Sequence, residues 1–376
     1  MICVTKFVQV ISCNLPLFKL MLMRLGIYIM KKIVHIVESF GGGVYSYLSD
    51  LTSGLVDEYE VYILYGMREQ TPQNIVEDFD SKVKLIKIKN FTRHLDLISD
   101  IKASLEIKKY LKEIKPNIIH LHSSKAGGIG RLIKFNKGQK VFYTPHGYSF
   151  LNGENGNLKS KLYLSAEKML GNKKALTIAC SKGEYKQSQR VTRYSTFINN
   201  SIDVDFLSRF KTDDTNSVDT IFTIGRISEQ KNPKLFNNIA SQFPNKQFIW
   251  IGDGPLKSEL TSSNITVTGW MSREEVLKEI QPYKYFVLTS KWEGLPISLL
   301  EAMYFSKICF VTNIIGNNDV VTNNSNGYIF NDAKDFEEKF NAQNILKQDP
   351  SSFIEDNFSK REMIRKYKKV YSNSEL

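Results

Sequence analysis

Short apolar runs alternate with amphipathic stretches along most of the chain. Residues 33–37 are rich in β-branched side chains, as in a buried strand, whereas residues 97–114 carry apolar side chains at helical spacing. Further strand-like runs of the first half lie at 61–64, 83–88, 118–121, 141–143 and 176–179. Strands that alternate with helices predict a parallel, doubly wound α/β sheet. The loops that follow the strands of such a sheet meet at one edge, where ligands bind.

A second series of the same kind begins after the polar segment 211–217. Its strand-like runs lie at 220–224, 247–251, 266–268, 285–288, 308–311 and 328–330. We therefore predict two Rossmann-like domains, at 30–200 and 201–357, which face each other across a cleft. The basic amphipathic stretch 358–371 predicts a last helix, and we expect the segment 358–376 to pack back toward the first domain.

Residues 1–29 stand apart from this pattern. They are apolar, but an asparagine, a proline and charged residues interrupt them, so no run approaches the ~18 residues of a transmembrane helix. We interpret the segment as an extension upstream of the true start at Met30, and a membrane-contacting segment is the alternative. The whole composition, 42% hydrophobic and 24% charged, is typical of a soluble globular protein. Four scattered cysteines predict reduced thiols in a cytoplasmic protein.

The net charge of +12 is concentrated in the first half of the chain. Residues 30–200 hold 27 Lys and Arg against 16 Asp and Glu, whereas residues 201–376 hold 21 against 23. A basic domain beside a nearly neutral one indicates an anionic partner, either nucleic acid, lipid headgroups or a pyrophosphate-bearing substrate. We see no aromatic and basic platform of the kind that single-stranded nucleic acid needs, so we expect no nucleic acid partner.

The segment 293–301 (Glu-Gly-Leu-Pro-Ile-Ser-Leu-Leu-Glu) carries the clearest chemical pattern. It follows a predicted strand, and Pro296 suits the first turn of a helix that we expect at about 296–305. The free N–H groups at the start of that helix favour an anion such as a diphosphate. Glu293 and Glu301 would lie at the edge of the cleft, where carboxylates accept hydrogen bonds from ribose and sugar hydroxyls.

Loops after three other strands of the second domain offer charge and open backbone. Gly225 allows a tight turn, and Arg226 and Lys231 on the same loop can clamp phosphate oxygens. The loops after the next two strands contain Gly252 and Gly254, and then Gly269 and Met271. Glycines after consecutive strands favour a shared ligand over unrelated turns.

The first domain has its own glycine-rich turn at 41–43, between a strand and a helix. A dinucleotide fingerprint needs Gly at 41, 43 and 46, but position 46 is Ser. We therefore expect Gly42 and Gly43 to let a substrate approach the bare backbone.

The histidines differ in their setting. His35 lies inside a predicted strand, where packing explains it, and His120 and His122 alternate along the end of another strand. His146 lies on a loop between Pro145 and Gly147, where exposure makes it the functional candidate.

Together these motifs resemble the retaining glycosyltransferases of family 4, which have the two-domain architecture called GT-B. The resemblance runs from Met30 to about Tyr371, and its strongest marker is the spacing of Glu293 and Glu301 around an intact Glu-Gly-Leu-Pro. The loop 225–232 is similar to the phosphate-binding loop of the family. The stretches 123–132 and 143–147 resemble the subgroup that builds bacterial capsule, exopolysaccharide or O-antigen repeat units, and 197–203 resembles the interdomain linker.

The resemblance implies a role for each matching position. The catalytic residues would be Arg226 and Lys231 on the leaving diphosphate, Glu293 on the donor sugar, and His146 near the reacting carbon. The donor-binding residues would be Gly43, Gly225, Gly252, Gly254, Met271, Gly294, Leu295, Pro296 and Glu301, with Glu301 on the nucleotide ribose. The acceptor-binding residues would be Gly42, Lys125 and Arg131.

The resemblance also implies a reaction and its partners. A hexose-type sugar would pass from a nucleotide-sugar, by family habit a UDP-sugar, to a polyprenyl-diphosphate-linked or other saccharide acceptor at the anionic inner face of the plasma membrane. A nucleotide-sugar epimerase of the same architecture and a non-catalytic partner subunit are the alternatives. We expect no metal and no other cofactor, because the acid pair Asp203 and Asp205 lies in the predicted hinge rather than at a strand end.

Overall fold

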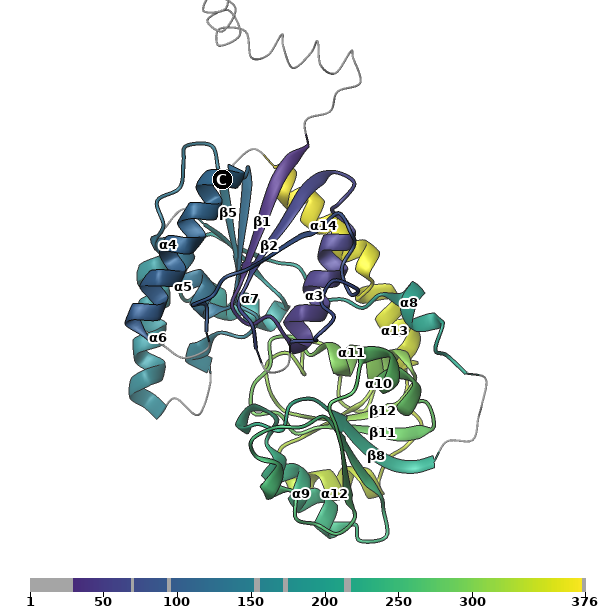
Figure 1. Ribbon diagram of the computed structural model, residues 1–376. Helices are drawn as coiled ribbons and strands as arrows, with labels where there is room; N and C mark the ends of the chain where they lie inside the picture. The colour runs from purple at the N-terminus through teal and green to yellow at the C-terminus, as the bar shows by residue number, and fades with distance from the viewer. Residues whose placement is uncertain are drawn as a thin grey trace, which may run out of the picture.

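The computed structural model describes residues 30–68, 71–92, 96–151, 156–171, 175–212 and 218–373. These residues form two α/β domains that meet along one side of each, with the first domain above the second in Figure 1. The predicted extension 1–29 lies outside the described residues, and so does most of the polar segment 211–217, at 213–217.

The first domain is built on seven parallel strands in the order β3-β2-β1-β4-β5-β6-β7. These strands are β1 (Lys31–Val37), β2 (Tyr59–Tyr65), β3 (Lys84–Lys87), β4 (Ile118–His122), β5 (Lys140–Thr144), β6 (Leu176–Ala179) and β7 (Ser195–Phe197). Its helices are α3 (Gly42–Ser53), α4 (Leu97–Ile114), α5 (Ser124–Leu132), α6 (Gly156–Gly171) and α7 (Lys182–Ser188). The short, polar edge strand β7 carries no apolar run, so the sequence pattern did not predict it.

Both faces of this sheet are covered, as in other parallel sheets. Alternate residues of β1, such as Val34 and Ile36, pack in a core with α4 and α5. The residues between them, such as Ile33 and Val37, belong to a second core that includes side chains of α3.

The second domain is built on six parallel strands in the order β10-β9-β8-β11-β12-β13. They are β8 (Val218–Ile224), β9 (Phe248–Ile251), β10 (Ile265–Gly269), β11 (Tyr283–Leu288), β12 (Ile308–Thr312) and β13 (Tyr328–Phe330). Its main helices are α9 (Pro233–Gln242), α10 (Arg273–Glu279), α11 (Ile297–Tyr304), α12 (Ala333–Asn341) and α13 (Pro350–Asn357). The prediction of two parallel α/β sheets is thus confirmed.

Two connections run between the domains. The chain enters the second domain through the short helix α8 (Val204–Ser208), and the last helix α14 (Lys360–Ser372) lies against α3 of the first domain (Figure 1). The hydroxyl of Tyr367 on α14 hydrogen-bonds with that of Tyr47 on α3, and Tyr371 contacts His120 on β4 at 2.7 Å. A continuous set of buried apolar side chains extends from the first sheet through α3 and α14 to α11. The two domains therefore share one core across their junction.

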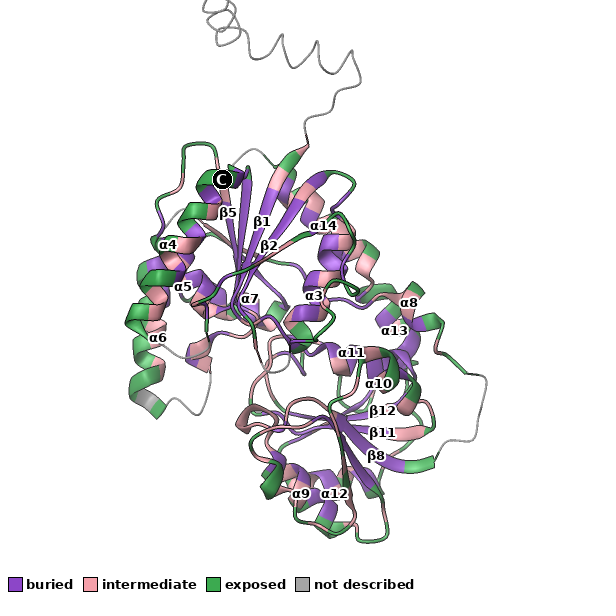
Figure 2. Cartoon of the chain, in the orientation of Figure 1, coloured by how far each residue is buried: buried purple, intermediate pink, exposed green. Residues whose placement is uncertain are grey.

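Helix α4 buries only some of the apolar side chains that its sequence places at helical spacing. Ala103, Ile107, Leu111 and Ile114 pack on the sheet. The apolar side chains of its first half are exposed, and Figure 2 shows exposed residues along the outer surfaces of α4 and α6. The exposed apolar residues of α4 are Leu97, Ile98, Ile101 and Leu105.

Candidate active site

Loops from the two domains touch where their sheet edges face each other. The loop after β5 carries His146 and Gly147, and the loop after β11 carries Gly294. A Cβ atom added to Gly294 would lie 2.9 Å from the Cys180 sulfur and 3.2 Å from the Gly147 nitrogen. Such distances are too short for a side chain, so only glycine permits this contact between the domains.

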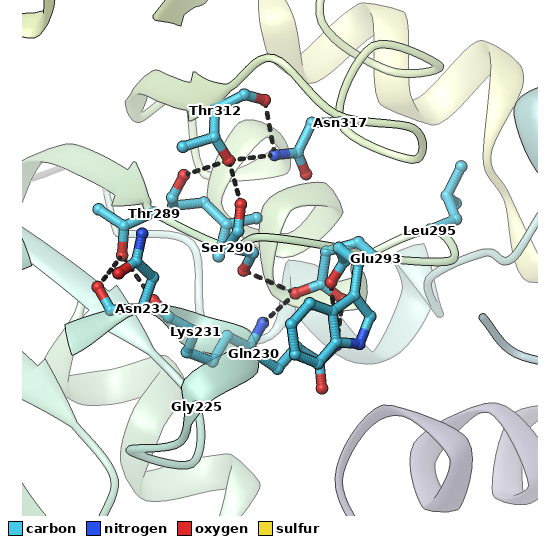
Figure 3. Close-up of polar contacts among 12 residues, drawn as sticks. Gly225, Gln230, Lys231, Asn232, Thr289, Ser290, Glu293, Leu295, Thr312 and Asn317 are labelled. Atoms are coloured by element: carbon cyan, nitrogen blue, oxygen red, sulfur yellow. Dashed lines mark hydrogen bonds and ion pairs between the residues drawn. The ribbon is translucent and has the colours of Figure 1, made fainter. Parts of the chain in front are cut away.

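The centre of the site is a partly buried ion pair between Lys231 and Glu293. The Lys231 Nζ atom lies 2.6 Å from Oε1 of Glu293, and the side chains are only 15% and 10% exposed. Figure 3 shows the lysine pointing from the loop after β8 toward the carboxylate on the loop after β11. Ser290 also donates to Oε1, at 2.8 Å, and Gln230 donates to Oε2 at 3.3 Å. The carboxylate is therefore fixed by three side chains.

A second layer of hydrogen bonds holds these loops in place. Thr289 donates to the main-chain oxygen of Lys231 at 2.7 Å, and Thr312 donates to that of Ser290 at 2.6 Å. Asn317 donates to the main-chain oxygen of Thr312 at 3.0 Å (Figure 3). These contacts of Gln230, Ser290, Thr312 and Asn317 were not predicted from the sequence. Of these four residues, only Ser290 had a signal in the sequence, because it follows a buried strand together with Thr289.

The glycines after β8 and β9 are required by packing within the domain. Gly225 and Gly252 have φ angles of +142° and +138°, which L side chains rarely adopt. A Cβ atom on Gly252 would lie 2.3 Å from the Gly225 oxygen, and one on Gly254 would lie 2.2 Å from the Ile227 oxygen. These residues let the two loops lie against each other, which explains them without a ligand. Their predicted contact with the donor stays a prediction.

Two further predicted donor residues lie on the neighbouring loops. Arg226 is half-buried on the same loop as Lys231, directly after Gly225. Met271 is half-buried in the connection between β10 and α10, where it packs against the core that the two domains share.

Helix α11 begins one residue later than predicted, at Ile297, with Pro296 as its N-cap. Leu295 is buried just before it, and its main-chain oxygen accepts a hydrogen bond from Asn200 in the interdomain connection, at 2.9 Å. The start of α11 also meets the first domain, because a Cβ atom on Gly43 of α3 would lie 4.0 Å from Cδ1 of Ile297. The N-termini of α3 and α11 therefore face each other across the junction.

Glu301 lies on the same helix but forms an ion pair of its own. Arg273 at the start of α10 donates twice to Oε1 of Glu301, at 2.8 and 3.1 Å. Asp50 on α3 is close enough to interact electrostatically with both, and Lys360 on α14 lies 3.5 Å from it. Burial raises the pKa of Asp50 to about 6, although Arg273 and Lys360 act in the opposite direction. Arg273 was not predicted from the sequence.

His146 faces the Gly294 loop from the first domain in a constrained conformation. Its φ angle is +52°, in the left-handed region that a residue other than glycine rarely adopts. The next backbone N–H, of Gly147, donates to Glu184 on α7 at 2.6 Å, and the ring packs edge-on against Tyr47. Burial lowers the pKa of His146 to about 3, so the ring is neutral at physiological pH. A neutral imidazole here acts through hydrogen bonds rather than through charge.

The predicted acceptor residues do not form one group. Gly42 starts α3 with a φ of +55° and has open space around it. Lys125 pairs with Asp100 on α4 at 2.6 Å. Arg131 is buried, pairs with Glu167 on α6 at 2.8 Å and stacks on the ring of Tyr143. This placement does not fit the expected acceptor contact of Arg131, because its guanidinium group is enclosed inside the first domain.

Asp203 belongs to the acid pair at which we expected no metal, and it has a structural role. Its carboxylate caps α8 by accepting from the N–H of Phe206 at 3.0 Å, and it pairs with Lys360 at 2.7 Å.

Comparison with known proteins agrees with this geometry. The model of the family described as "Glycosyltransferase Family 4" matches residues 41–206, and the model described as "Glycosyl transferases group 1" matches residues 206–369. The two models cover the two domains and nearly all of the described chain. The chain belongs to glycosyltransferase family 4.

Two relatives of this glycosyltransferase have assigned activities. The UDP-Gal:alpha-D-GlcNAc-diphosphoundecaprenol alpha-1,3-galactosyltransferase of Escherichia coli is 28% identical over 79% of this chain and 86% of its own. The GalNAc-alpha-(1->4)-GalNAc-alpha-(1->3)-diNAcBac-PP-undecaprenol alpha-1,4-N-acetyl-D-galactosaminyltransferase of Campylobacter jejuni is 25% identical over 85% of this chain and 91% of its own.

A solved structure supports the fold of this glycosyltransferase. The Anabaena protein HepE, in complex with UDP and glucose, superposes with a TM-score of 0.74 over 91% of this chain and 99% of its own, at 16% identity. The architecture is GT-B.

Proposed function

We propose that this glycosyltransferase moves a hexose-type sugar from a UDP-sugar to a lipid-linked saccharide, with retention of the anomeric configuration, in the synthesis of a bacterial surface polysaccharide. The observation that carries the proposal is the partly buried Lys231–Glu293 pair beside the contact between Gly294 and the His146 loop. The names of the Escherichia coli and Campylobacter jejuni relatives, both of which act on undecaprenol-linked sugars, support this acceptor class.

The leaving diphosphate would be held by positive groups of the second domain. Lys231 is held in place by Glu293, and Arg226 lies on the same loop. The positive end of the α11 dipole, at the start of the helix, would add to the positive potential of the junction. Groups fixed before the reaction stabilise the charge that develops on the diphosphate without further reorganisation.

The transfer itself needs no covalent enzyme intermediate. As the bond between C1 of the sugar and the β-phosphate oxygen breaks, the acceptor oxygen forms its bond to C1 on the same face. The acceptor proton passes to the leaving diphosphate. Glu293 would bind hydroxyls of the donor sugar, and His146 would bind the sugar near C1 from the other domain.

Glu301 would bind the ribose. Among the described residues, both hydrogen bonds that the Glu301 carboxylate accepts end on Oε1, which leaves Oε2 for a ribose hydroxyl. Arg273 would then act as the residue that holds the carboxylate in position.

The outer helices of the first domain would contact the membrane that carries the acceptor. Leu97 on α4 and Leu158 on α6 are 76% and 74% exposed, and more apolar side chains are exposed beside them. The apolar members are Leu97, Ile98, Ile101 and Leu105 on α4, Leu132 on α5, and Leu158, Leu162 and Met169 on α6. Exposed lysines on α4 and α6 are Lys102, Lys108, Lys109, Lys112, Lys159, Lys161 and Lys168.

This surface, which we call the α4–α6 surface, is placed suitably for a lipid-linked acceptor. In a parallel α/β domain the helices run antiparallel to the strands, so the first halves of α4 and α6 lie at the same edge as the active-site loops. Apolar side chains among lysines suit the boundary of an anionic bilayer, where each lysine contributes about 1 kcal/mol. In the part of the chain that the structure describes, no helix combines the length and apolar character needed to cross a bilayer.

Incubation with separate UDP-hexoses and UDP-N-acetylhexosamines, with and without an undecaprenyl-diphosphate-linked sugar, tests the proposal. We expect an extended lipid-linked product only when both substrates are present, with little product from a Glu293→Gln variant. Conversion of a nucleotide-sugar into its epimer without any acceptor would contradict the proposal and favour an epimerase. Absence of turnover with every donor would favour a non-catalytic subunit.

A further inference from the structure

Three imidazole rings form a chain that leads from the candidate site into the core of the first domain. His122 on β4 places Nδ1 3.1 Å from Nε2 of His146, and places Nε2 3.0 Å from Nδ1 of His35 on β1. The neighbouring rings in this chain are nearly parallel, at 24° and 29°. Both nitrogen–nitrogen distances are those of direct hydrogen bonds. We call these three residues the histidine chain.

The sheet explains why the chain forms. His35 pairs with His120 across β1 and β4, and His122 lies two residues beyond His120, so all three side chains are on the same face. His120 is held from the side, by Tyr371 at 2.7 Å and Thr144 at 2.9 Å, and its ring centroid lies 4.0 Å from that of His122. The ring of His122 is thus enclosed on several sides.

Each ring of the chain is neutral and has one proton to share. His35 and His122 are fully buried, and burial lowers the pKa of both far below the ordinary value of histidine. In a row of neutral imidazoles, each ring donates a hydrogen bond from one nitrogen and accepts one at the other. The position of the proton on the innermost ring therefore sets which way all the hydrogen bonds of the row point.

The inner end of the histidine chain gives that direction. Among the residues that the structure describes, none is a hydrogen-bond partner of the buried Nε2 atom of His35. A buried N–H group without an acceptor is rarer than an unused lone pair, so the proton of His35 belongs on Nδ1. Then His35 donates to His122, His122 donates from Nδ1 to Nε2 of His146, and the proton of His146 remains on Nδ1.

We propose that His35 and His122 are positioning residues that hold His146 as its Nδ1–H tautomer, so that its remaining nitrogen donates a hydrogen bond to an oxygen of the bound donor. The effect on catalysis rests on the proposed function, whereas the tautomer itself belongs to the ligand-free protein. A misplaced proton would turn the donor group of His146 into an acceptor and would repel the same oxygen.

A bound metal ion is a different explanation for the cluster of His35, His120 and His122, whose nitrogens lie within 4.8 Å of one another. Two imidazole nitrogens on one tetrahedral zinc at ~2.0–2.1 Å would lie roughly 3.3–3.4 Å apart. The shorter 3.0 Å between His35 and His122, and the bonds of His120 to Tyr371 and Thr144, favour hydrogen bonding.

Long-range ¹H–¹⁵N correlation spectra of ¹⁵N-histidine-labelled protein test the proposal directly. We expect the wild-type protein to have a protonated Nδ1 and a bare Nε2 at His146. A bare Nδ1 in wild type would overturn the proposal without any variant. Purified protein that contains one equivalent of zinc, lost in a His35→Leu variant, would also overturn it.

Variants separate a positioning role from simple packing. His35→Leu should give a mixture of tautomers at His146 and a roughly tenfold lower kcat with little change in UDP affinity. His35→Asn can still donate from the position of Nδ1 and should restore both properties. His120→Asn, at an equally buried position outside the chain, should leave the tautomer of His146 unchanged. An identical tautomer in wild type and His35→Leu overturns the proposal.

The same experiments distinguish this inference from the proposed function. If the tautomer changes as expected while His146→Ala transfers sugar at the wild-type rate, then the catalytic role of His146 fails and its tautomer assignment stands.

Discussion

At the scale of single residues, the proposed diphosphate site depends on the Lys231–Glu293 pair. Two opposite charges that are both nearly buried cost solvation free energy, which their mutual attraction and the bonds from Ser290 and Gln230 offset. An incoming diphosphate would add a second anionic partner for the lysine, so the pair holds the lysine in place before the donor arrives.

Replacement of Lys231 by Ala should reduce kcat for sugar transfer by about 10²–10³-fold, as for loss of one preorganised donor group in other enzymes. Steady-state transfer assays with a radiolabelled donor measure this effect. The matched control is Lys234→Ala, because Lys234 is three residues away but exposed. A Lys231→Ala variant that folds normally and keeps more than half of the wild-type rate would contradict the site assignment.

At the scale of elements, Asp50 couples three helices electrostatically. Its carboxylate on α3 interacts with Arg273 of α10 and with Lys360 of α14. Burial raises the pKa of Asp50 to about 6, well above the ordinary value of an aspartate. The folded protein therefore binds this proton more tightly than the unfolded chain does. The contribution of Asp50 to stability is most favourable below about pH 4 and is lost as the pH rises through 6.

Asp50→Asn should therefore be more stable than wild type at pH 7, by about 1–3 kcal/mol, and the difference should vanish near pH 4. Urea unfolding followed at several pH values between 4 and 7 measures it. Asp57→Asn is the exposed control and should show a small difference of opposite sign, since Lys82 lowers the pKa of Asp57. A difference for Asp50→Asn that does not vary with pH would show that its carboxylate titrates normally.

Helix α4 belongs to the same scale, because one helix both covers the sheet and presents the α4–α6 surface. Replacement of Leu97, Ile101 and Leu105 by Ser should reduce binding to phosphatidylglycerol vesicles at least tenfold, since each apolar side chain at the interface contributes about 1 kcal/mol. Vesicle sedimentation measures this binding. Transfer to a water-soluble acceptor should be unchanged.

The control for that experiment is the pair Val76→Ser and Ile345→Ser, which changes exposed apolar residues outside the α4–α6 surface. If the triple variant of α4 and this double variant bound vesicles equally well, the α4–α6 surface would be excluded as the membrane contact.

At the scale of the whole molecule, helix α14 joins the two domains. Met363, Tyr367 and Tyr371 of α14 are almost fully buried in the core that the two domains share. The domains are therefore coupled by α14, by the connection at Asn200 and by the contact of Gly147 with Gly294.

A chain that ends at Ser359 should lose at least about 5 kcal/mol of stability, because three large side chains leave the core at about 1.5–3 kcal/mol each. Thermal unfolding followed by circular dichroism checks this. A chain that ends at Asn373 keeps α14 and should unfold like the full chain. A cooperative transition at the wild-type temperature in the shorter chain would show that α14 adds nothing to the core.

Much of the fold follows from the sequence by itself, because parallel strands are buried on both faces and stand out as β-branched runs. All six strands of the second sheet, and six of the seven in the first, lie within about two residues of their predicted positions. The placement of Glu293, Lys231 and His146 after strands of the two sheets also follows from the sequence, whereas their chemical roles stay predictions.

Only the tertiary structure decided which of these residues meet. The pairing of Lys231 with Glu293, 62 positions apart, depends on how the loops after β8 and β11 pack. The same packing gives Glu301 a partner in Arg273, buries Arg131 against Glu167, and joins His35, His122 and His146 into one chain. Apolar and charged positions along a chain specify burial and secondary structure locally. Contacts between side chains distant in sequence depend on how the elements pack together.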